Sequence, residues 1–456
     1  MNYFSKIKPV LNKLSELNVY DSLEVVRAYM QASADGNTNR AYVAGVNHSE
    51  ANSVEVWFAD FLIANIIKYC GDFPSQKSLR DVNPRHAICN KIEELHQEIS
   101  HKQIDEEVFV WLNSYIFNQF KILAKDNELR ALYRYYYLYK TPKIKAYAED
   151  KMGMPLDAYF KMAFFVYAIF AGNGRFHVKE DYFTPKRKSF DEVTKTALDY
   201  LLSQISKPLP ELKRLCKDYC SYDEDKLFGF FNDAPHVKYP LIKDKGGYFC
   251  TIPKYITTAL LDGLYYRLDI PNSGDPDVNK EFSENTENYL GLIFEHFLNG
   301  SKVKCRQEIT YDAGKRKTQR TSDWILWDDT DICFMDCKTK RISVKGKQAV
   351  TVDDEESLSN TPGYKDRIIK VAQSYREFKN GHPEPIDEKT VKMLSVKNIE
   401  ECACVIAKEG IGYYLEHHMD NQLMAQKFVK DKFLLDKCNE ELINPFLEEM
   451  KEYYGK

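Results

Sequence analysis

An acidic residue and a lysine stand on either side of one cysteine at the end of a short apolar segment. The triplet is Asp336, Cys337 and Lys338, and it follows Ile332–Met335 directly. Another aspartate, Asp323, stands thirteen residues before Asp336, at the start of a second apolar segment. Carboxylates of this kind hold divalent cations, and a bound cation can activate water beside a phosphate. The residue types and their spacing therefore predict metal-assisted hydrolysis of a phosphodiester.

The two apolar segments predict a β-hairpin. Ser322–Trp327 and Ile332–Lys338 contain Trp, Ile, Leu and Phe, and the polar residues 328–331 between them have turn chemistry. A short loop with an even number of residues makes three pairs of residues face each other: Asp323 with Asp336, Ile325 with Phe334, and Trp327 with Ile332. The two carboxylates then share one face, and the alternation of side chains returns Lys338 to that face.

A cation would stabilise this arrangement. Directly opposite residues have Cβ atoms roughly 5 Å apart, and like charges at that distance repel by about 3 kcal/mol at an effective dielectric of about 20. Oxygen ligands from Asp323, Asp336 and the backbone carbonyl of Cys337 suit Mg²⁺ or Mn²⁺. We expect such an ion to stabilise charge on the phosphate oxygens and to activate a water that Lys338 orients or deprotonates.

A third carboxylate is expected from the segment before these strands. Residues Asn288–Leu298 predict a helix that is apolar nearly all round and therefore buried, and Asn299 with Gly300 predicts its end. Glu295 lies in the middle of this helix, and buried carboxylates are usually paired or bound to metal. We therefore expect Glu295 to reach the metal directly or through water.

The surrounding elements are predicted to be a strand before the hairpin and a helix and a strand after it. The first strand is Val303–Tyr311. Thr361 and Pro362 begin the helix, which contains Gln373 and ends at Asn380 and Gly381. The run Cys402–Ala407 reads as a buried strand.

This order of elements and these residues resemble the PD-(D/E)XK nuclease superfamily, over roughly Asn279 to Lys408. The resemblance implies an αβββαβ restriction-endonuclease-like core of the α/β class, with Mg²⁺-dependent cleavage of phosphodiester bonds. It implies catalytic positions at Asp323, Asp336, Lys338, Glu295 and Gln373. The chain departs from the family pattern at Ser322, which stands where the family usually has proline. The resemblance does not choose between DNA and RNA; we expect DNA, cut by an endonuclease.

Two other interpretations stay open. In one, the strands belong to an α/β domain in which Asp and Lys form a solvated surface pair. In the other, the nuclease fold is catalytically inactive and serves as a nucleic-acid-binding domain or a protein-interaction scaffold. The apolar residues on both faces of the predicted hairpin favour a packed sheet over a solvated surface pair.

Basic residues gather on both sides of the predicted site. The whole chain has a formal net charge of −4, so any affinity for nucleic acid must be local. Residues 301–347 contain twelve Lys or Arg and seven Asp or Glu, a net charge of +5. We expect phosphate contacts from six of them: Lys315, Arg316, Lys317, Arg320, Lys340 and Arg341. A solvated basic loop is the alternative interpretation.

Composition and periodicity predict three domains in the 456 residues. Residues 1–205 have mostly helical periodicity and predict a helical domain, residues 206–277 an α+β connector with a hairpin around Lys243–Gly247, and residues 278–456 the nuclease domain. The aromatic run Tyr133–Tyr139 is typical either of single-strand binding or, more often, of helix packing. Residues Lys143–Ala171 predict a helical hairpin in preference to a DNA-binding helix-turn-helix, because the second helix is very apolar.

The remaining expectations concern location and partners. The chain has no apolar signal region near Met1, and its longest apolar run, Met162–Ala171, is half a bilayer span, so a cytoplasmic protein with no membrane contact is expected. Eleven cysteines without Cys-x-x-Cys pairs predict reduced thiols. Nucleic acid is the expected partner, and the helical region is expected to bind a protein or a second copy of the chain. By analogy, such nucleases serve as effectors of bacterial restriction or anti-phage defence.

Overall fold

The computed structural model describes residues 3–35, 56–73, 77–102, 128–171, 175–183, 190–219, 234–312, 318–335, 337 and 396–414. These residues are mostly helical, with small mixed and antiparallel sheets, which is compatible with an α/β protein that has a large helical part. The chain forms two compact units. The first contains described residues from 1–125 and 148–269, and the second those from 126–147, 270–343 and 356–456.

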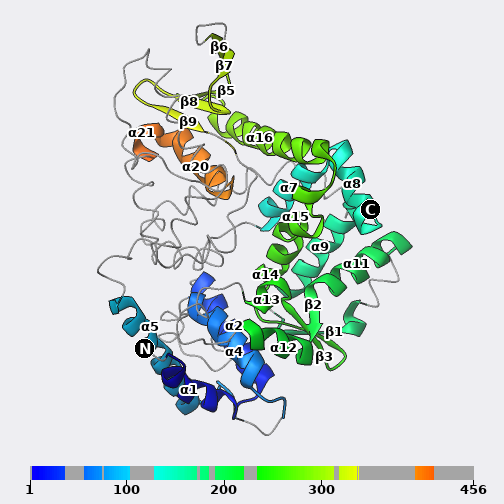
Figure 1. The fold of residues 1–456 in the computed structure, drawn as a ribbon, viewed down its shortest axis with the longest axis vertical. Coiled ribbons are helices and arrows are strands. Elements are labelled where there is room, and N and C mark those ends of the chain that lie inside the picture. The colour runs from blue at the N-terminus through cyan, green and yellow to red at the C-terminus, as the bar shows by residue number, and fades with distance from the viewer. Residues whose placement is uncertain are drawn as a thin grey trace. The chain divides into compact units, whose positions relative to one another are not determined.

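The first unit is built from helices packed around an apolar core (Figure 1). Its N-terminal helices bury Leu, Val, Ile and Phe side chains almost completely, among them Leu23, Phe61 and Ile66. Further along the chain, helices α9 and α11 pack against each other. The helices of this unit are α1 (Tyr3–Leu14), α2 (Val19–Asp35), α4 (Val56–Tyr69), α5 (Val82–Lys102), α9 (Leu156–Ala171), α11 (Glu192–Ile205), α12 (Leu209–Tyr219), α13 (Pro235–Lys238), α14 (Lys254–Thr257) and α15 (Leu264–Arg267), with a 3-10 turn at Glu180–Tyr182 and a π-helical turn at Thr258–Asp262.

A four-stranded sheet completes the first unit. Its order is β1 (His177–Lys179), β4 (Gly247–Cys250), β3 (Leu241–Asp244) and β2 (Ser206–Pro208), with β2 parallel to β3 and the other pairs antiparallel. The predicted hairpin is present, and its loop consists of Lys245 and Gly246, both with positive φ. Two consecutive residues in that conformation give a turn whose twist matches the strands.

Arg27 connects this sheet to helices α2 and α9 through hydrogen bonds. It is 2% exposed and lies on α2, and its guanidinium donates hydrogen bonds to the carbonyl of Cys250 on β4 at 2.5 Å and to that of Phe170 on α9 at 3.1 Å. A second buried polar group joins other elements: Asp60 on α4 accepts a hydrogen bond from the Tyr255 hydroxyl and contacts His236 at 2.8 Å. Buried polar groups satisfied in this way fix how apolar elements pack.

The second unit combines helices with two small antiparallel sheets (Figure 1). One sheet has the order β5–β8–β9, and the other pairs β6 with β7. Helix α16 packs against α7 and α20, and Asn285 on α16 donates hydrogen bonds to the carbonyl of Leu138 and to the hydroxyl of Thr141. The elements are α7 (Glu128–Tyr139), a 3-10 turn at Ile270–Asn272, α16 (Pro276–Leu298), β5 (Lys304–Gln307), β6 (Thr310–Asp312), β7 (Thr318–Arg320), β8 (Trp324–Trp327), β9 (Ile332–Met335), α20 (Val396–Glu409) and α21 (Ile411–Tyr414); α8 (Pro142–Met152) starts in this unit and ends in the first.

Several sequence predictions are confirmed here. Helix α16 ends at Leu298, followed by Asn299 and by Gly300 with a φ of +77°, as predicted. Helix α7 covers the predicted segment, and its Tyr133 and Tyr137 rings lie 6.1 Å and 5.5 Å from the ring of Tyr289 on α16. These ring contacts support the packing interpretation of the tyrosine run.

One strand prediction is wrong, and a second is confirmed only in part. Cys402–Ala407 lies inside helix α20, where Ala403, Cys404, Val405 and Ile406 are buried. An apolar run of six residues fits a buried helix as well as a buried strand, and its longer flanks decide the outcome. The predicted strand Val303–Tyr311 is divided into β5 and β6. The predicted helix at 361–381 lies outside the described residues, and the segment predicted as the last strand is helical, so the αβββαβ core is not confirmed.

The thiol and membrane expectations have separate outcomes. Seven described cysteines, including Cys216 and Cys305, lie outside any disulfide, whereas Cys404 is disulfide-bonded, so the expectation of reduced thiols fails at that position. Among the helices that the structure describes, none alone is long and apolar enough to cross a bilayer; α8 and α9 meet that criterion only together, and they are bent by 69°.

The role of Arg27 gives a prediction for stability. Replacing Arg27 by Met leaves two buried carbonyls without their donor, and we expect a loss of about 3 kcal/mol, at about 1–3 kcal/mol for each unsatisfied group. The measurement is the midpoint of urea unfolding followed by circular dichroism. Arg80→Met is the matched control, because Arg80 is 45% exposed and pairs with Glu24 at the surface, where loss of the pair costs about 1 kcal/mol or less. Equal shifts in the two variants would contradict the assigned role of Arg27.

Candidate functional site

The β8–β9 hairpin has the predicted register. Ile325 pairs with Phe334 and Trp327 with Ile332, and residues 328–331 form the connecting loop. Asp323 comes directly before β8 and is partly buried. Its carboxylate Oδ2 accepts a hydrogen bond from the backbone N–H of Cys337 at 2.7 Å. The first acidic residue of the predicted site thus contacts the middle residue of the Asp336, Cys337 and Lys338 triplet.

Helix α16 fixes one face of the β5–β8–β9 sheet. Trp324 packs its ring against Phe294 with a centroid distance of 5.3 Å, and a Cβ added at Gly291 would lie 2.8 Å from the Trp324 ring. Only glycine therefore permits this approach between helix and strand. By alternation, Trp324 and Leu326 point toward α16, and Ile325 and Trp327 point to the opposite face.

A β-bulge immediately precedes Asp323. The N–H of Glu308 donates to the carbonyl of Asp323 at 2.9 Å, and the N–H of Thr321 donates to the carbonyl of Ile309 at 3.0 Å. Between these two hydrogen bonds one strand advances by one residue, from Glu308 to Ile309. The other strand advances by two residues, from Thr321 to Asp323, so Ser322 is the extra residue. Bulges are frequent beside active sites, where they redirect a side chain. Ser322 is fully buried, and it occupies the position where the resembled family has proline.

Most other residues of the predicted site lie outside the described part of the chain. These are Asp336, Lys338 and Gln373 of the catalytic set, and Lys315, Arg316, Lys317, Lys340 and Arg341 of the basic set. Arg320 is described: its guanidinium is exposed and pairs with Glu308 at 2.9 Å. Among the described residues alone, no group of three His, Cys, Asp or Glu side chains is placed to hold a metal ion.

The predicted burial of Glu295 is wrong. Its side chain is exposed, although the apolar residues around it on α16 are buried. Burial raises the pKa of Cys305 on β5, and the negative charge of Glu295 raises it further. Cys305 pairs with Leu326, so it belongs to the face of the sheet that points toward α16. The helix is amphipathic rather than apolar all round, because its Glu and His side chains occupy a solvent-facing stripe.

The pairing also reveals residues that the sequence analysis missed. Glu308 lies opposite Asp323, and Lys304 and Arg306 precede it on the same face of β5. All three are exposed. The alternation of charged residues along Lys-Cys-Arg-Gln-Glu was a visible signal, but only the pairing with β8 shows which face they share.

Asp328 holds the hairpin loop and connects it to α21. Its Oδ1 accepts hydrogen bonds from the N–H groups of Thr330 and Asp331 at 3.0 and 2.9 Å, and its Oδ2 accepts one from the N–H of Ile411 at 3.0 Å. Burial by itself raises the pKa of Asp328, but these hydrogen bonds outweigh burial and lower the pKa to about 2. The charged carboxylate therefore joins the hairpin loop to helix α21 through hydrogen bonds.

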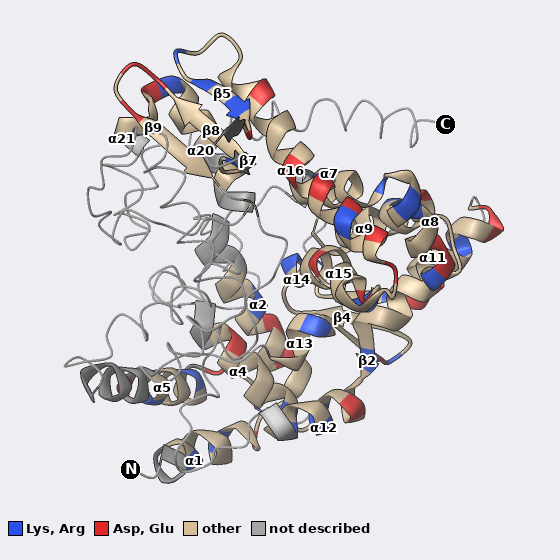
Figure 2. Ribbon diagram, turned by 45° about the horizontal axis from the view of Figure 1, so that its top comes forward, with Lys and Arg blue, Asp and Glu red and all other residues tan. Residues whose placement is uncertain are grey.

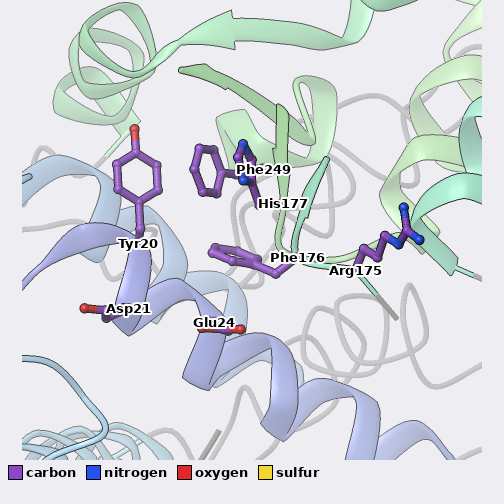
Figure 3. A pocket seen from close by; sticks show the side chains of 7 residues that line it. All are labelled: Tyr20, Asp21, Glu24, Arg175, Phe176, His177 and Phe249. Atoms are coloured by element: carbon purple, nitrogen blue, oxygen red, sulfur yellow. The ribbon is translucent and has the colours of Figure 1, made fainter. Parts of the chain in front are cut away.

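The first unit contains a cavity of about 430 Å³ (Figure 3). Aromatic side chains of α2, β1 and β4 gather at it, and the His177 ring stacks on Phe249 with a centroid distance of 4.1 Å. Burial lowers the pKa of His177, and the charges of Lys179 and Lys245 lower it further. The acidic residues at its edge have partners: Arg80 pairs with Glu24 and lies 3.9 Å from Asp21. The cavity is therefore bordered by rings and by carboxylates that are already neutralised.

Comparison with protein-family models, curated protein sequences and solved structures finds no match to this chain.

The hydrogen bonds that lower the pKa of Asp328 predict that the free energy of unfolding depends on pH. A carboxylate whose folded pKa lies below its value of 3.8 in the unfolded chain stabilises the fold above about pH 4, and the stabilisation is lost as pH falls toward about 2. After allowance for solvent, we expect roughly 1–2 kcal/mol. Asp328→Asn should lose this part of the pH dependence between pH 5 and pH 2 in thermal melts. Asp329→Asn, at an exposed position in the same loop, is the control. Identical pH profiles for Asp328→Asn and the wild type would contradict the proposed stabilisation by the charged Asp328 carboxylate.

Proposed function

We propose that this protein is a metal-dependent nuclease that hydrolyses phosphodiester bonds. The observation that carries the proposal is the contact of the Asp323 carboxylate with the N–H of Cys337, in a hairpin whose register is the one that the chemistry requires. Extending that register by one residue predicts Asp336 opposite Asp323. Two carboxylates brought together in this way would repel each other, and a bound cation would reverse the sign of that interaction.

The proposed roles follow from the donor set. Asp323, Asp336 and the carbonyl of Cys337 would hold Mg²⁺ or Mn²⁺, since all are hard oxygen ligands. The ion supplies Lewis acidity and lowers the pKa of a bound water. Lys338 would orient that water, and Gln373 would support the site. Glu295 is left out of this set, because its side chain is exposed on α16 and its charge acts on Cys305, which lies on the face of the sheet that points toward α16.

The substrate and the biological role rest on the resemblance. We propose DNA in preference to RNA as the substrate, internal cleavage, and a role as an effector of bacterial restriction or anti-phage defence, with the helical unit binding a protein partner or a second copy. The competing function is a nucleic-acid-binding or protein-interaction scaffold without activity. The two differ in whether divalent metal binds at Asp323.

Cleavage by the purified full chain tests the proposal. Supercoiled plasmid, single-stranded DNA and RNA are incubated with Mg²⁺, with Mn²⁺ or with EDTA. We expect metal-dependent cleavage, and a loss of about 100-fold or more in Asp323→Asn, Asp336→Ala and Lys338→Ala, which remove a ligand or the group that orients water. Asp329→Asn, an exposed carboxylate in the adjacent loop, is the matched control and should retain activity.

Direct metal binding separates an inactive protein from a wrong assignment. Titration of the full chain with Mn²⁺, followed by electron paramagnetic resonance, should show one site that Asp323→Asn and Asp336→Ala weaken. Absence of both cleavage and Mn²⁺ binding in the folded wild type would exclude the nuclease and favour the scaffold.

A further inference from the structure

We infer that the cavity of the first unit binds a nucleotide, with Arg175 holding its phosphate, Phe176 contacting its base and Asp21 accepting hydrogen bonds from the base. The cavity has a volume of about 430 Å³, which is typical of sites for small molecules. The residues that line it belong to the first unit, whereas Asp323 belongs to the second. The inference therefore goes beyond the proposed nuclease site and does not depend on it.

One wall of the cavity is held in place by close packing. The His177 ring stacks on the Phe249 ring, with 4.1 Å between centroids and 13° between the planes. Gly247 permits this position, because a Cβ there would lie 2.5 Å from Nε2 of His177. The carbonyl of Phe176 accepts a hydrogen bond from the N–H of Cys250 at 2.9 Å, which anchors Phe176 to β4. A wall fixed in this way needs little rearrangement to receive a ligand.

Arg175 supplies a cation at the cavity. Its side chain is exposed, and its guanidinium lies over the Tyr182 ring, 4.4 Å from the centroid. Among the residues that the structure describes, no carboxylate forms an ion pair with Arg175. A guanidinium presents N–H donors in a planar fork that matches the oxygens of a phosphate. Arg175 is therefore the expected contact of the phosphate.

The charges around the cavity balance, so they do not exclude an anion. The carboxylates of Asp21 and Glu24 are matched by the guanidinium groups of Arg80 and Arg175. Burial lowers the pKa of His177, so this ring is uncharged at neutral pH. Acidic and basic residues are interspersed along the described helices of this unit (Figure 2). Affinity for an anion therefore has to come from a local group, which is Arg175.

Asp21 offers hydrogen-bond acceptors to a base. Its side chain is 47% exposed, and the distance of 3.9 Å between its Oδ1 and Nη2 of Arg80 is too long for a hydrogen bond. In the part of the chain that the structure describes, no group donates a hydrogen bond to this carboxylate. A carboxylate accepts hydrogen bonds but does not donate them. It therefore favours a base with adjacent N–H donors, such as guanine, whose N1–H and amino group can both reach one carboxylate.

Aromatic side chains favour a ligand with a planar ring. The rings of Phe176 and His177 are half-buried and line the cavity. Figure 3 shows them on the segment that leads into β1, and Asp21 on α2. Bases stack on aromatic side chains, and this contact tolerates any base. A small zwitterion such as alanine would also satisfy Arg175 and Asp21, but it has no ring to contact Phe176 and His177.

Calorimetric titration of the full chain with GMP tests the site. EDTA is present, so that metal plays no part. We expect Arg175→Gln to weaken GMP binding at least about tenfold, because a charge-assisted contact with phosphate is lost, and Asp21→Ala and Phe176→Leu to weaken it at least about fivefold each. Arg214→Gln on α12 and Glu192→Ala in the first turn of α11 are matched controls. Both positions are exposed and lie outside the cavity lining, so these variants should bind within about twofold of the wild type.

Comparison of ligands identifies the groups that are recognised. Ribose 5-phosphate lacks the base and guanosine lacks the phosphate, so each should bind at least about tenfold more weakly than GMP. The nucleotide can be a free molecule or the first residue of a strand. A 5′-phosphorylated tetranucleotide that begins with guanine distinguishes the two sources: tighter binding of GMP identifies a free nucleotide, and tighter binding of the tetranucleotide identifies a strand end.

Thermal melts confirm that each variant is folded. The inference would be overturned by the absence of GMP binding at millimolar concentration, by wild-type affinity in both Arg175→Gln and Asp21→Ala, or by equal affinity for GMP and either ribose 5-phosphate or alanine. Asp323→Asn should bind GMP as the wild type does, and loss of binding in that variant would assign the nucleotide to the proposed metal site instead. Failure of GMP to bind would leave the proposed nuclease unaffected, since cleavage and Mn²⁺ binding are measured separately.

Discussion

The pairing register of β5, β8 and β9 is the constraint on which the candidate site depends. Side chains alternate along a strand, so a slip of one residue would move Asp323, Ile325 and Trp327 to the side of α16. Two contacts oppose such a slip. The Trp324 ring fits against Gly291, where a methyl group would clash, and Asp328 binds the backbone of its own loop and of Ile411. One contact fixes the face of the sheet, and the other fixes the loop that sets the pairing.

The bulge at Ser322 explains how an irregular position can serve the site. Without the bulge, β7 and β8 would form one regular strand, and the backbone at Asp323 would have the same twist as the rest of that strand. Because Ser322 is an extra residue, the pairing of Thr321 with the neighbouring strand is shifted by one residue. The Asp323 carboxylate accepts a hydrogen bond from the N–H of Cys337. In the resembled family a proline commonly stands here, and proline, which has no N–H, is likewise tolerated at bulges. Serine can therefore occupy a position at which the ladder is already interrupted.

What the sequence could predict was local. The hairpin register followed from a short polar loop with an even number of residues between two apolar segments, and the end of α16 followed from Asn299 and Gly300, because both signals lie within a few residues. Cys402–Ala407 was misassigned because an apolar run fits either kind of buried element. The exposure of Glu295 depends on which side of α16 is packed, and the joining of α7 to α16 depends on contacts more than a hundred residues apart in the chain. The role of Asp336, Lys338 and Gln373 stays a prediction.

The charges along β5 suggest how substrate binding and metal binding depend on each other. The chain as a whole is acidic, so attraction for a polyanion has to come from a local surface such as Lys304 and Arg306. The sign of charge changes at the next row, where Glu308 and Asp323 stand, and Arg320 pairs with Glu308 at 2.9 Å. In the proposed nuclease, a phosphate that approaches Asp323 would meet the negative charge of this carboxylate. The same carboxylate that repels phosphate alone would attract it once it holds a divalent ion. In the proposed nuclease, close approach of a phosphate to Asp323 would therefore require a bound cation.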